Sequence, residues 1–244
     1  MKFVIAATIF ITALNSVSSQ TNKVKMAFIG NSITAGVYDY KKSDINESYA
    51  TKFAKLMQEV YGDTLETFNA GVSGRTLTKH GPAPIWNEDV FEKALKYQPD
   101  ICLIALGTND SKPSLFDMVQ KEFYNDYQNM IDTFKSVNPD IVFIVCLPPP
   151  IWEGHPYSPK DPHNDTLLVK YTIPLIDSIA VTNDLLVVDF YTTFIGKSQY
   201  FTDKLHPNPE GSKEMARLLF DRFRKEDLIH KALKMKNSVI IYNN

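Results

Sequence analysis

The stretch KMAFIGNSITAG (residues 25–36) shows the pattern that the rest of the chain repeats. An apolar run ends at Ile29, and a glycine-flanked polar turn follows at once. Four further runs rich in Ile, Val, Leu and Phe occur at TLETF (64–68), DICLIAL (100–106), DIVFIVCL (140–147) and LLVVDF (185–190). Two of these runs are apolar throughout, which is typical of strands buried on both faces of a sheet.

Helical patterns occupy the intervals between the runs. Apolar residues recur every three or four positions in 47–62, 87–98, 123–137, 167–182 and 208–225. Gly62 closes the first of these helices, and Asn208 begins the last one as its N-cap. Pro174 should kink the fourth helix or start a new turn. Strands that alternate with helices predict a five-stranded parallel sheet with helices on both faces, a three-layer α/β/α sandwich in one domain over residues 20–244.

The N-terminus and the C-terminus differ from this pattern. Residues 1–19 hold one lysine, an apolar run over 3–14 and small polar residues, the composition of a secretory signal peptide. The run is too short to span a bilayer, so we expect a secreted or periplasmic protein without stable membrane insertion. The alternative is a buried N-terminal strand or helix. Residues 231–244 favour either a helix end with a short strand or partial disorder.

Composition excludes some partners and leaves others open. The chain has 244 residues and a net charge of −2, so it lacks the basic character of a nucleic-acid-binding protein. His80, His155 and His163 lie in expected loops without metal-ligand spacing, so we expect no metal and no other cofactor. Cys102 and Cys146 lie inside apolar runs and are expected to be free core thiols. The oligomeric state is open.

Polar, glycine-bearing segments follow the expected strands. They are GNSIT (30–34), NAGVSGRT (69–76), GTNDS (107–111), PPPIWEGHPY (148–157) and, past the fifth strand, DKLHPN (203–208). Ligands bind outside the carboxyl ends of the strands in an open parallel sheet. The sequence therefore predicts that these segments share one rim.

Three residues of this rim have the chemistry of acyl transfer. Ser32 is a candidate nucleophile, but a serine hydroxyl needs a base to take its proton. His206 is the candidate base, and Asp203 lies close enough in sequence to orient its imidazole. Asp189, at the end of the fifth strand, is a rival for that acidic role. Taken alone, Ser32 also fits an ordinary helix cap.

An oxyanion hole requires donors that are already in place. The candidates are the backbone N–H groups of Ser32 and Gly74 and the side-chain amide of Asn109. Asn109 also fits an ordinary turn residue. Asp110 is expected to bind turn backbone rather than to take part in chemistry.

The set formed by Ser32, Gly74, Asn109 and His206, in this order and with Asp203 beside the histidine, resembles the SGNH (GDSL-type) hydrolase superfamily. The resemblance implies a flavodoxin-like fold and a serine esterase, and it covers nearly all of the chain after residue 19. Asn31 stands where the family name implies Asp, at a position without a triad role. An α/β-hydrolase is excluded because Thr34 stands where its G-x-S-x-G motif needs glycine.

A finer resemblance is to sialate O-acetylesterase-like members, through GVSGRTLTKHGPAPIW (71–86), LGTNDSKP (106–113) and CLPPP (146–150). It implies an exported esterase that removes acetyl groups from sugars such as O-acetylated sialic acid. Arg75 is then a candidate partner of a substrate carboxylate, and Trp86 and Trp152 are candidate sugar platforms. The alternatives are a lipase or thioesterase with the same triad, and a catalytically silent carbohydrate-binding protein.

Overall fold

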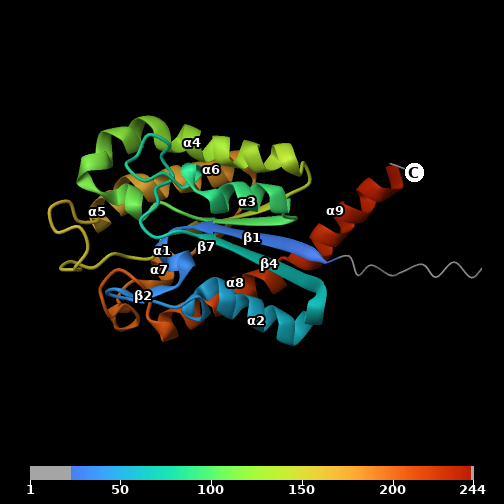
Figure 1. The fold of residues 1–244 in the computed structure, drawn as a ribbon, viewed down its shortest axis with the longest axis horizontal. Helices are drawn as coiled ribbons and strands as arrows, with labels where there is room; N and C mark the ends of the chain where they lie inside the picture. The colour runs from blue at the N-terminus through green and yellow to red at the C-terminus, as the bar shows by residue number, and fades with distance from the viewer. Residues whose placement is uncertain (1–22, 243–244) are drawn as a thin grey trace, which may run out of the picture.

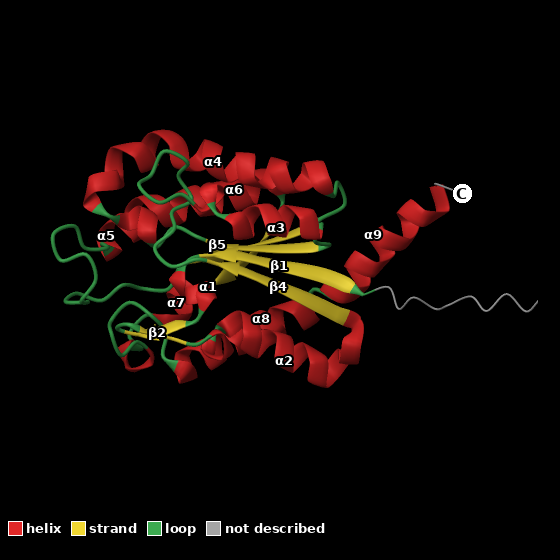
Figure 2. Ribbon diagram, viewed as in Figure 1, coloured by secondary structure: helices red, strands yellow, loops and turns green. Residues whose placement is uncertain are grey.

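The computed structural model describes residues 23–242, so the expected leader over residues 1–19 lies outside the described residues. A parallel sheet of five strands forms the centre of the molecule (Figures 1 and 2). Its strands are β1 (Val24–Gly30), β4 (Leu65–Gly71), β5 (Ile101–Ala105), β6 (Val142–Leu147) and β7 (Leu186–Asp189). The predicted α/β sandwich is confirmed, and each strand lies on one of the five apolar runs.

The strand order is β4-β1-β5-β6-β7. Counted along the chain, the second strand therefore lies on one side of the first strand and the third strand on the other. In this order the direction of chain winding reverses at β1, and a crevice opens beyond the carboxyl ends of β1 and β5. The fold thus places the segment that follows β1 at the natural ligand site of the sheet.

Helices cover both faces of the sheet (Figure 2). The longer helices are α2 (Tyr49–Tyr61), α3 (Asp89–Tyr97), α4 (Phe116–Val137), α6 (Ile173–Asn183), α8 (Pro209–Lys225) and α9 (Leu228–Tyr242). Met26 and Phe28 of β1 pack with α2 and α8, whereas Ala27 and Ile29 pack with α3, α4 and α6. This alternation explains why the central strand is apolar at nearly every position.

Short elements connect the strands and the longer helices. They are α1 (Ser32–Ala35), β2 (Val37–Asp39), β3 (Lys42–Ser43), η1 (Ile45–Glu47), η2 (Gly62–Thr64), η3 (Ile85–Asn87), η4 (Asn109–Ser111), η5 (Pro113–Leu115), α5 (Asp165–Leu167), η6 (Leu168–Thr172), α7 (Phe190–Phe194) and η7 (Ser198–Tyr200). The hairpin β2–β3 is absent from the sequence prediction because its strands hold only three and two residues. Within the described chain, no helix has both the length and the apolar character needed to cross a bilayer.

Three expectations meet different outcomes. Pro174 lies in the first turn of α6, which begins at Ile173 directly after the π-helical turn η6, so the expectation that it starts a new turn is confirmed. The C-terminal segment continues as α9 to Tyr242, without the short strand that was one of the expectations. Cys102 and Cys146 are buried free thiols, as predicted, and they belong to the cores on opposite faces of the sheet.

Candidate active site

The polar segments that follow the strands meet at the carboxyl edge of the sheet, on the left in Figure 1. Ser32 is the first residue of α1, directly beyond β1. Gly74 follows β4, Asn109 begins η4 beyond β5, and His206 lies shortly before α8. These segments and the loop that follows β6 line one cleft.

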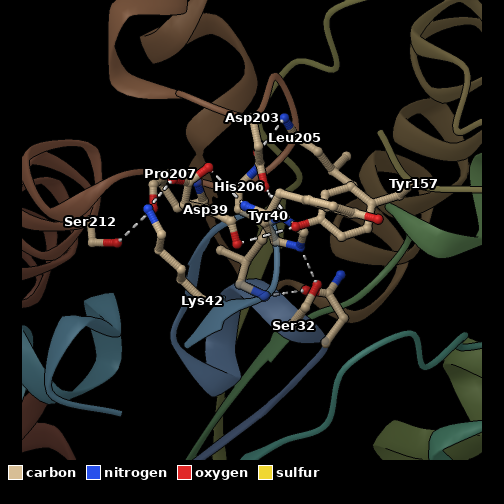
Figure 3. A network of polar contacts seen from close by, with 12 residues as sticks. Ser32, Asp39, Tyr40, Lys42, Tyr157, Asp203, Leu205, His206, Pro207 and Ser212 are labelled. Atoms are coloured by element: carbon tan, nitrogen blue, oxygen red, sulfur yellow. Dashed lines mark hydrogen bonds and ion pairs between the residues drawn. The ribbon is translucent and has the colours of Figure 1, made fainter. Parts of the chain in front are cut away.

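A chain of hydrogen bonds joins three side chains in this cleft (Figure 3). The Oγ atom of Ser32 lies 2.8 Å from Nε2 of His206, and Nδ1 of His206 lies 2.8 Å from Oδ2 of Asp203. All three residues are buried, with 9%, 3% and 6% of their surface exposed. In such a chain the imidazole can accept the serine proton while the carboxylate fixes its tautomer.

Asp203 is held in its charged form by several donors. Its Oδ1 atom accepts from the backbone N–H groups of Leu205 and His206, at 3.0 and 2.7 Å. Burial opposes ionisation of Asp203, but the hydrogen bonds from the side chain and backbone of His206 outweigh it and lower the pKa of this carboxyl to about 2. Asp203 is therefore an anion at neutral pH.

Tyr157, in the loop beyond β6, adds a further donor that sequence reasoning missed. Its hydroxyl donates to Oδ2 of Asp203 at 2.8 Å, and its ring packs edge-on against the imidazole of His206 with centroids 4.8 Å apart. Burial, together with the negative charge of Asp203, raises the pKa of the Tyr157 hydroxyl, so the group keeps its proton. Tyr157 thus supports both members of the His–Asp pair.

The turn that carries Ser32 is fixed from two sides. The Asn31 side chain caps α1 by accepting from the N–H of Ile33 at 3.0 Å. The carbonyl of Thr34 accepts from Asn69 of β4, at 2.7 Å. Gly71 is needed here, because a Cβ atom at this position would lie 2.4 Å from the backbone nitrogen of Ala35.

The three residues expected to supply oxyanion donors line the same cleft. Ser32 belongs to the first turn of α1, where backbone N–H groups have no acceptor within the helix. Gly74 has a φ of +78°, a conformation that favours glycine, and it lines the cleft. The Asn109 side-chain amide donates one N–H to the carbonyl of Arg75 at 3.0 Å. Its other N–H is free for the cleft, which Asn109 also lines.

His163 orients the Asn109 amide. Its Nε2 atom lies 2.9 Å from Oδ1 of Asn109. Burial first, and the positive charge of Lys112 second, lower the pKa of His163 to about 3, so its ring is neutral and carries one proton. An amide oxygen only accepts, so this proton lies on Nε2. The His163 bond therefore fixes which end of the amide faces the cleft.

Asp110 joins the loop beyond β5 to the loop beyond β4. Its carboxylate accepts from the backbone N–H groups of Leu77 and Thr78, at 3.1 and 3.0 Å, and from the Thr78 hydroxyl. This confirms the expectation that Asp110 binds turn backbone. The bonds hold the segment that follows Gly74 against the turn that carries Asn109.

The cleft has a volume of about 420 Å³. Most of the residues that line it have polar side chains, and its aliphatic members are Val37 and Leu205. Besides these two, the lining consists of Ser32, Lys41, Lys42, Ser43, Ser73, Gly74, Asn109, Lys112, Tyr157, Ser158, His163 and His206.

The structure corrects the placement of the three candidate substrate contacts, none of which lines this cleft. Arg75 forms an ion pair with Glu88, with Nε and Oε1 2.5 Å apart. Trp86 donates to the carbonyl of Leu77 at 2.8 Å and packs on the core. Trp152 packs on Phe201, with ring centroids 4.5 Å apart, and lines a neighbouring cavity that shares His163 with the cleft.

The structure also places Asp189, the rival for the acidic role, and the side chains that could hold a metal ion. Asp189 caps α7 by accepting from the N–H of Thr192 at 2.8 Å, so it serves a helix rather than His206. Over residues 23–242, no group of three or more His, Cys, Asp or Glu side chains is arranged to hold a metal ion.

The family of the chain follows from its sequence match over residues 28–213 to the model of the GDSL-like Lipase/Acylhydrolase family. The chain belongs to this family of acylhydrolases. The matched region contains Ser32, Gly74, Asn109, Asp203 and His206.

A curated relative has a related description. An acetylxylan esterase of Xylanibacter ruminicola is 29% identical over 217 residues, which cover 80% of this chain and 42% of the relative. The chain therefore matches less than half of the length of that protein.

Solved structures of carbohydrate esterases share the fold. An acetyl xylan esterase named AlAXEase superposes with a TM-score of 0.61 at 22% identity, covering 81% of this chain and 98% of that one. Est24, a carbohydrate acetylesterase from Sinorhizobium meliloti, superposes with a TM-score of 0.63 at 16% identity, covering 83% and 99%. At these identities the likeness shows the fold alone.

The supporting residues Tyr157 and His163 gave little signal in the sequence. Both lie in the long loop beyond β6, more than 40 residues from their partners Asp203 and Asn109. Only the position of that loop after a strand indicated that it belongs to the rim. Which of its side chains turn inward depends on the loop path, which no periodic pattern encodes.

We expect His163→Leu to lower kcat by about ten- to a hundredfold with little change in KM, because an oxyanion donor that loses its orientation acts in the transition state. His163→Gln offers a donor again and should recover part of the loss. Steady-state kinetics and melting temperatures of both variants provide the measurement.

His155→Leu is the matched control, because His155 is a buried neighbour that contacts the carbonyl of His163 and not Asn109. It should lower the melting temperature and keep most of kcat. Equal kcat in His163→Leu and wild type would show that His163 has only a packing role.

The low pKa of Asp203 predicts a pH-dependent stability. A carboxyl whose pKa is depressed in the folded state stabilises the fold above its unfolded pKa of about 3.9 and loses this contribution as the pH falls toward its folded value. Above pH 4, the free energy of unfolding of wild type should exceed that of Asp203→Asn by on the order of 2 kcal/mol. This difference should disappear between about pH 4 and pH 2. Urea unfolding across this range measures it. Asp221→Asn, on the exposed face of α8, controls for the lost charge, and a gap that is constant with pH would contradict the prediction.

Proposed function

We propose that this protein is a serine esterase that removes a small acyl group, most often acetyl, from a carbohydrate. The observation that carries the proposal is the continuous chain of 2.8 Å hydrogen bonds from Ser32 through His206 to Asp203. Membership in a family of acylhydrolases supports it.

In the first half of the proposed reaction, Oγ of Ser32 attacks the ester carbonyl carbon as its proton passes to Nε2 of His206. Asp203 keeps the resulting imidazolium in place. The new negative charge forms on the former carbonyl oxygen, where the N–H groups of Ser32 and Gly74 and the Asn109 amide are available as donors. The C–O bond to the sugar then breaks, and His206 returns the proton to the departing sugar oxygen.

In the second half of the reaction, His206 transfers protons in the same way, with water in place of Ser32 as the nucleophile. His206 takes a proton from a water molecule, whose oxygen attacks the acyl carbon bound to Ser32. The bond between that carbon and Oγ breaks, and His206 gives the proton back to Ser32. Acetic acid leaves as the second product and gives its remaining proton to the solvent, and besides water the residues of the chain supply every group that these steps need.

The cleft favours a short acyl chain over the lipase or thioesterase alternative. A long acyl chain needs an apolar groove, and among the described residues of the wall the aliphatic ones are Val37 and Leu205. A silent binding protein is also disfavoured. A binder has no use for a buried imidazole within hydrogen-bond distance of a serine and fixed by a carboxylate.

The carbohydrate is proposed from the relatives. The curated relative is named for acetylated xylan, and the phrases that resemble sialate O-acetylesterases suggest acetylated sialic acid as a second carrier. Acetate release from acetylated xylan, from O-acetylated sialic acid and from acetylated monosaccharides would separate the carriers.

We also propose that residues 1–19 are a leader that is removed on export, because their composition is that of a signal peptide. Mass spectrometry of protein isolated from its host should show a chain that starts near Gln20. An intact N-terminus in that sample would contradict the proposal.

Ser32→Ala should fold normally and lose activity on the order of 10⁴-fold or more, because covalent catalysis is removed. An organophosphonate should label wild type at Ser32. Ser73→Ala, which removes another serine of the same cleft, should still be labelled. Turnover near the wild-type value in Ser32→Ala would overturn the triad assignment.

A series of 4-nitrophenyl esters tests the acyl group with a constant leaving group. We expect kcat/KM to be highest for acetate and to fall with butyrate and octanoate. A preference for octanoate would favour the lipase alternative, and no turnover of any ester would favour the binding protein.

A further inference from the structure

An acetyl group fills only a small part of the cleft, whose volume is about 420 Å³. The rest must hold the alcohol that leaves, so its lining indicates what that alcohol carries. Within the described wall of the cleft, the charged side chains apart from histidine are Lys41, Lys42 and Lys112, and none is acidic. The chain as a whole has 28 acidic and 26 basic residues, so this one-sided wall is a local feature.

The three lysines differ in their availability. The Lys42 ammonium is bound to Asp39, with 2.9 Å between Nζ and Oδ2 (Figure 3). Within the described part of the chain, the ammonium groups of Lys41 and Lys112 have no carboxylate within ion-pair distance. The Lys41 ammonium lies over the Tyr40 ring, 5.1 Å from its centroid, and this contact with a neutral ring does not cancel its charge.

Lys41 is tied to the catalytic centre through its hairpin. It occupies the turn between β2 and β3, next to Tyr40, whose ring packs against that of Tyr157 with centroids 5.3 Å apart. The Tyr157 hydroxyl, which donates its proton to the carboxylate of Asp203 at 2.8 Å, also lies 3.3 Å from the carbonyl oxygen of Asp39 in β2. The side chain that supports the His–Asp pair therefore also contacts the β2–β3 hairpin that carries Lys41.

Lys112 approaches from another segment of the wall. It lies three residues beyond Asn109 and caps η5. Lys112 and His163 both line the cleft, and the positive charge of Lys112 adds to burial in lowering the pKa of His163. The neighbouring carboxylate, Asp161, accepts from the backbone N–H and the hydroxyl of Ser114 and lies beyond ion-pair distance of Lys112.

The acidic groups near the cleft do not cancel this positive wall for a ligand. Asp203 is buried beneath His206 and Tyr157 and accepts four hydrogen bonds. Asp39 is neutralised by Lys42. A ligand in the cleft therefore meets the ammonium groups of Lys41 and Lys112 rather than a carboxylate.

We propose that Lys41 and Lys112 bind a carboxylate on the sugar that leaves, so that the preferred substrate is an acetylated acidic sugar such as a uronic acid residue. The proposal rests on the proposed esterase function and narrows its substrate class. It transfers to these lysines the anion-binding role that the sequence suggested for Arg75, which is paired with Glu88.

A matched pair of substrates tests this assignment. Acetylated methyl glucuronoside and acetylated methyl glucoside differ only in bearing a carboxylate or a hydroxymethyl group on the ring. For wild type at low salt we expect kcat/KM to be about three- to tenfold higher for the acid, mainly because KM is lower. The effect is modest because partly exposed ion pairs contribute little binding energy. The preference should shrink as salt is added, because exposed ion pairs are screened.

Lys41→Gln and Lys112→Gln should each lower the ratio of kcat/KM between acid and neutral sugar by about two- to threefold, and the double variant should bring it close to one. Lys213→Gln is the control, because Lys213 is equally cationic but 71% exposed on α8 and outside the cleft. It should leave the ratio and the activity unchanged.

Several outcomes would overturn the proposal. Equal kcat/KM of wild type for the acid and the neutral sugar would do so, as would an unchanged ratio in the double variant. If kcat/KM were higher for acetylated glucose 6-phosphate than for the glucuronoside, the group that the lysines bind would be a phosphate and not a carboxylate. Failure to hydrolyse any of these esters, with the aryl acetate also inert, would instead contradict the esterase function itself.

Discussion

The hydrogen bond between Ser32 and His206 depends on the whole fold, because the two residues are 174 positions apart. Ser32 is placed by the central strand β1, and His206 is placed by the turn before α8. Helix α8 reaches the same end of the sheet because it packs against α2, where Phe53 and Phe223 have ring centroids 5.0 Å apart. The aromatic core on this face therefore sets the distance between nucleophile and base. A shift of about 1 Å in such a contact costs catalysis heavily, so packing far from the cleft is part of the site.

Much of this arrangement could be predicted from the sequence, for identifiable physical reasons. Buried parallel strands are apolar nearly throughout, and the helices between them carry one apolar face. The three layers could therefore be predicted without the structure. The rule that ligands lie at the carboxyl ends of strands then placed Ser32, Gly74 and Asn109 on one rim. Asp203 and His206 were a local pair, and a turn of a few residues leaves few ways to arrange them.

The parts that could not be predicted are those that depend on the path of long loops. Arg75 and the two tryptophans looked suited to a sugar, yet each has a partner in the protein: Glu88, the carbonyl of Leu77 and Phe201. The sequence shows that such side chains exist, but it does not show which residues they contact in the folded protein. Conversely, Tyr157 and His163 lie in a loop without periodicity, and the short hairpin that carries Lys41 leaves no pattern of its own.

The supporting side chains are arranged so that catalysis and recognition share one scaffold. Asp203 and Asn109 each accept a hydrogen bond from a side chain of the loop beyond β6, Tyr157 for Asp203 and His163 for Asn109. A buried polar group that loses its partner costs more than the bond itself contributes, so this loop cannot vary freely without disturbing the catalytic residues. The same loop contacts the β2–β3 hairpin through Tyr157. A change of substrate that required the hairpin to move would therefore also strain the anchor of Asp203, and this coupling favours one class of leaving group over broad tolerance.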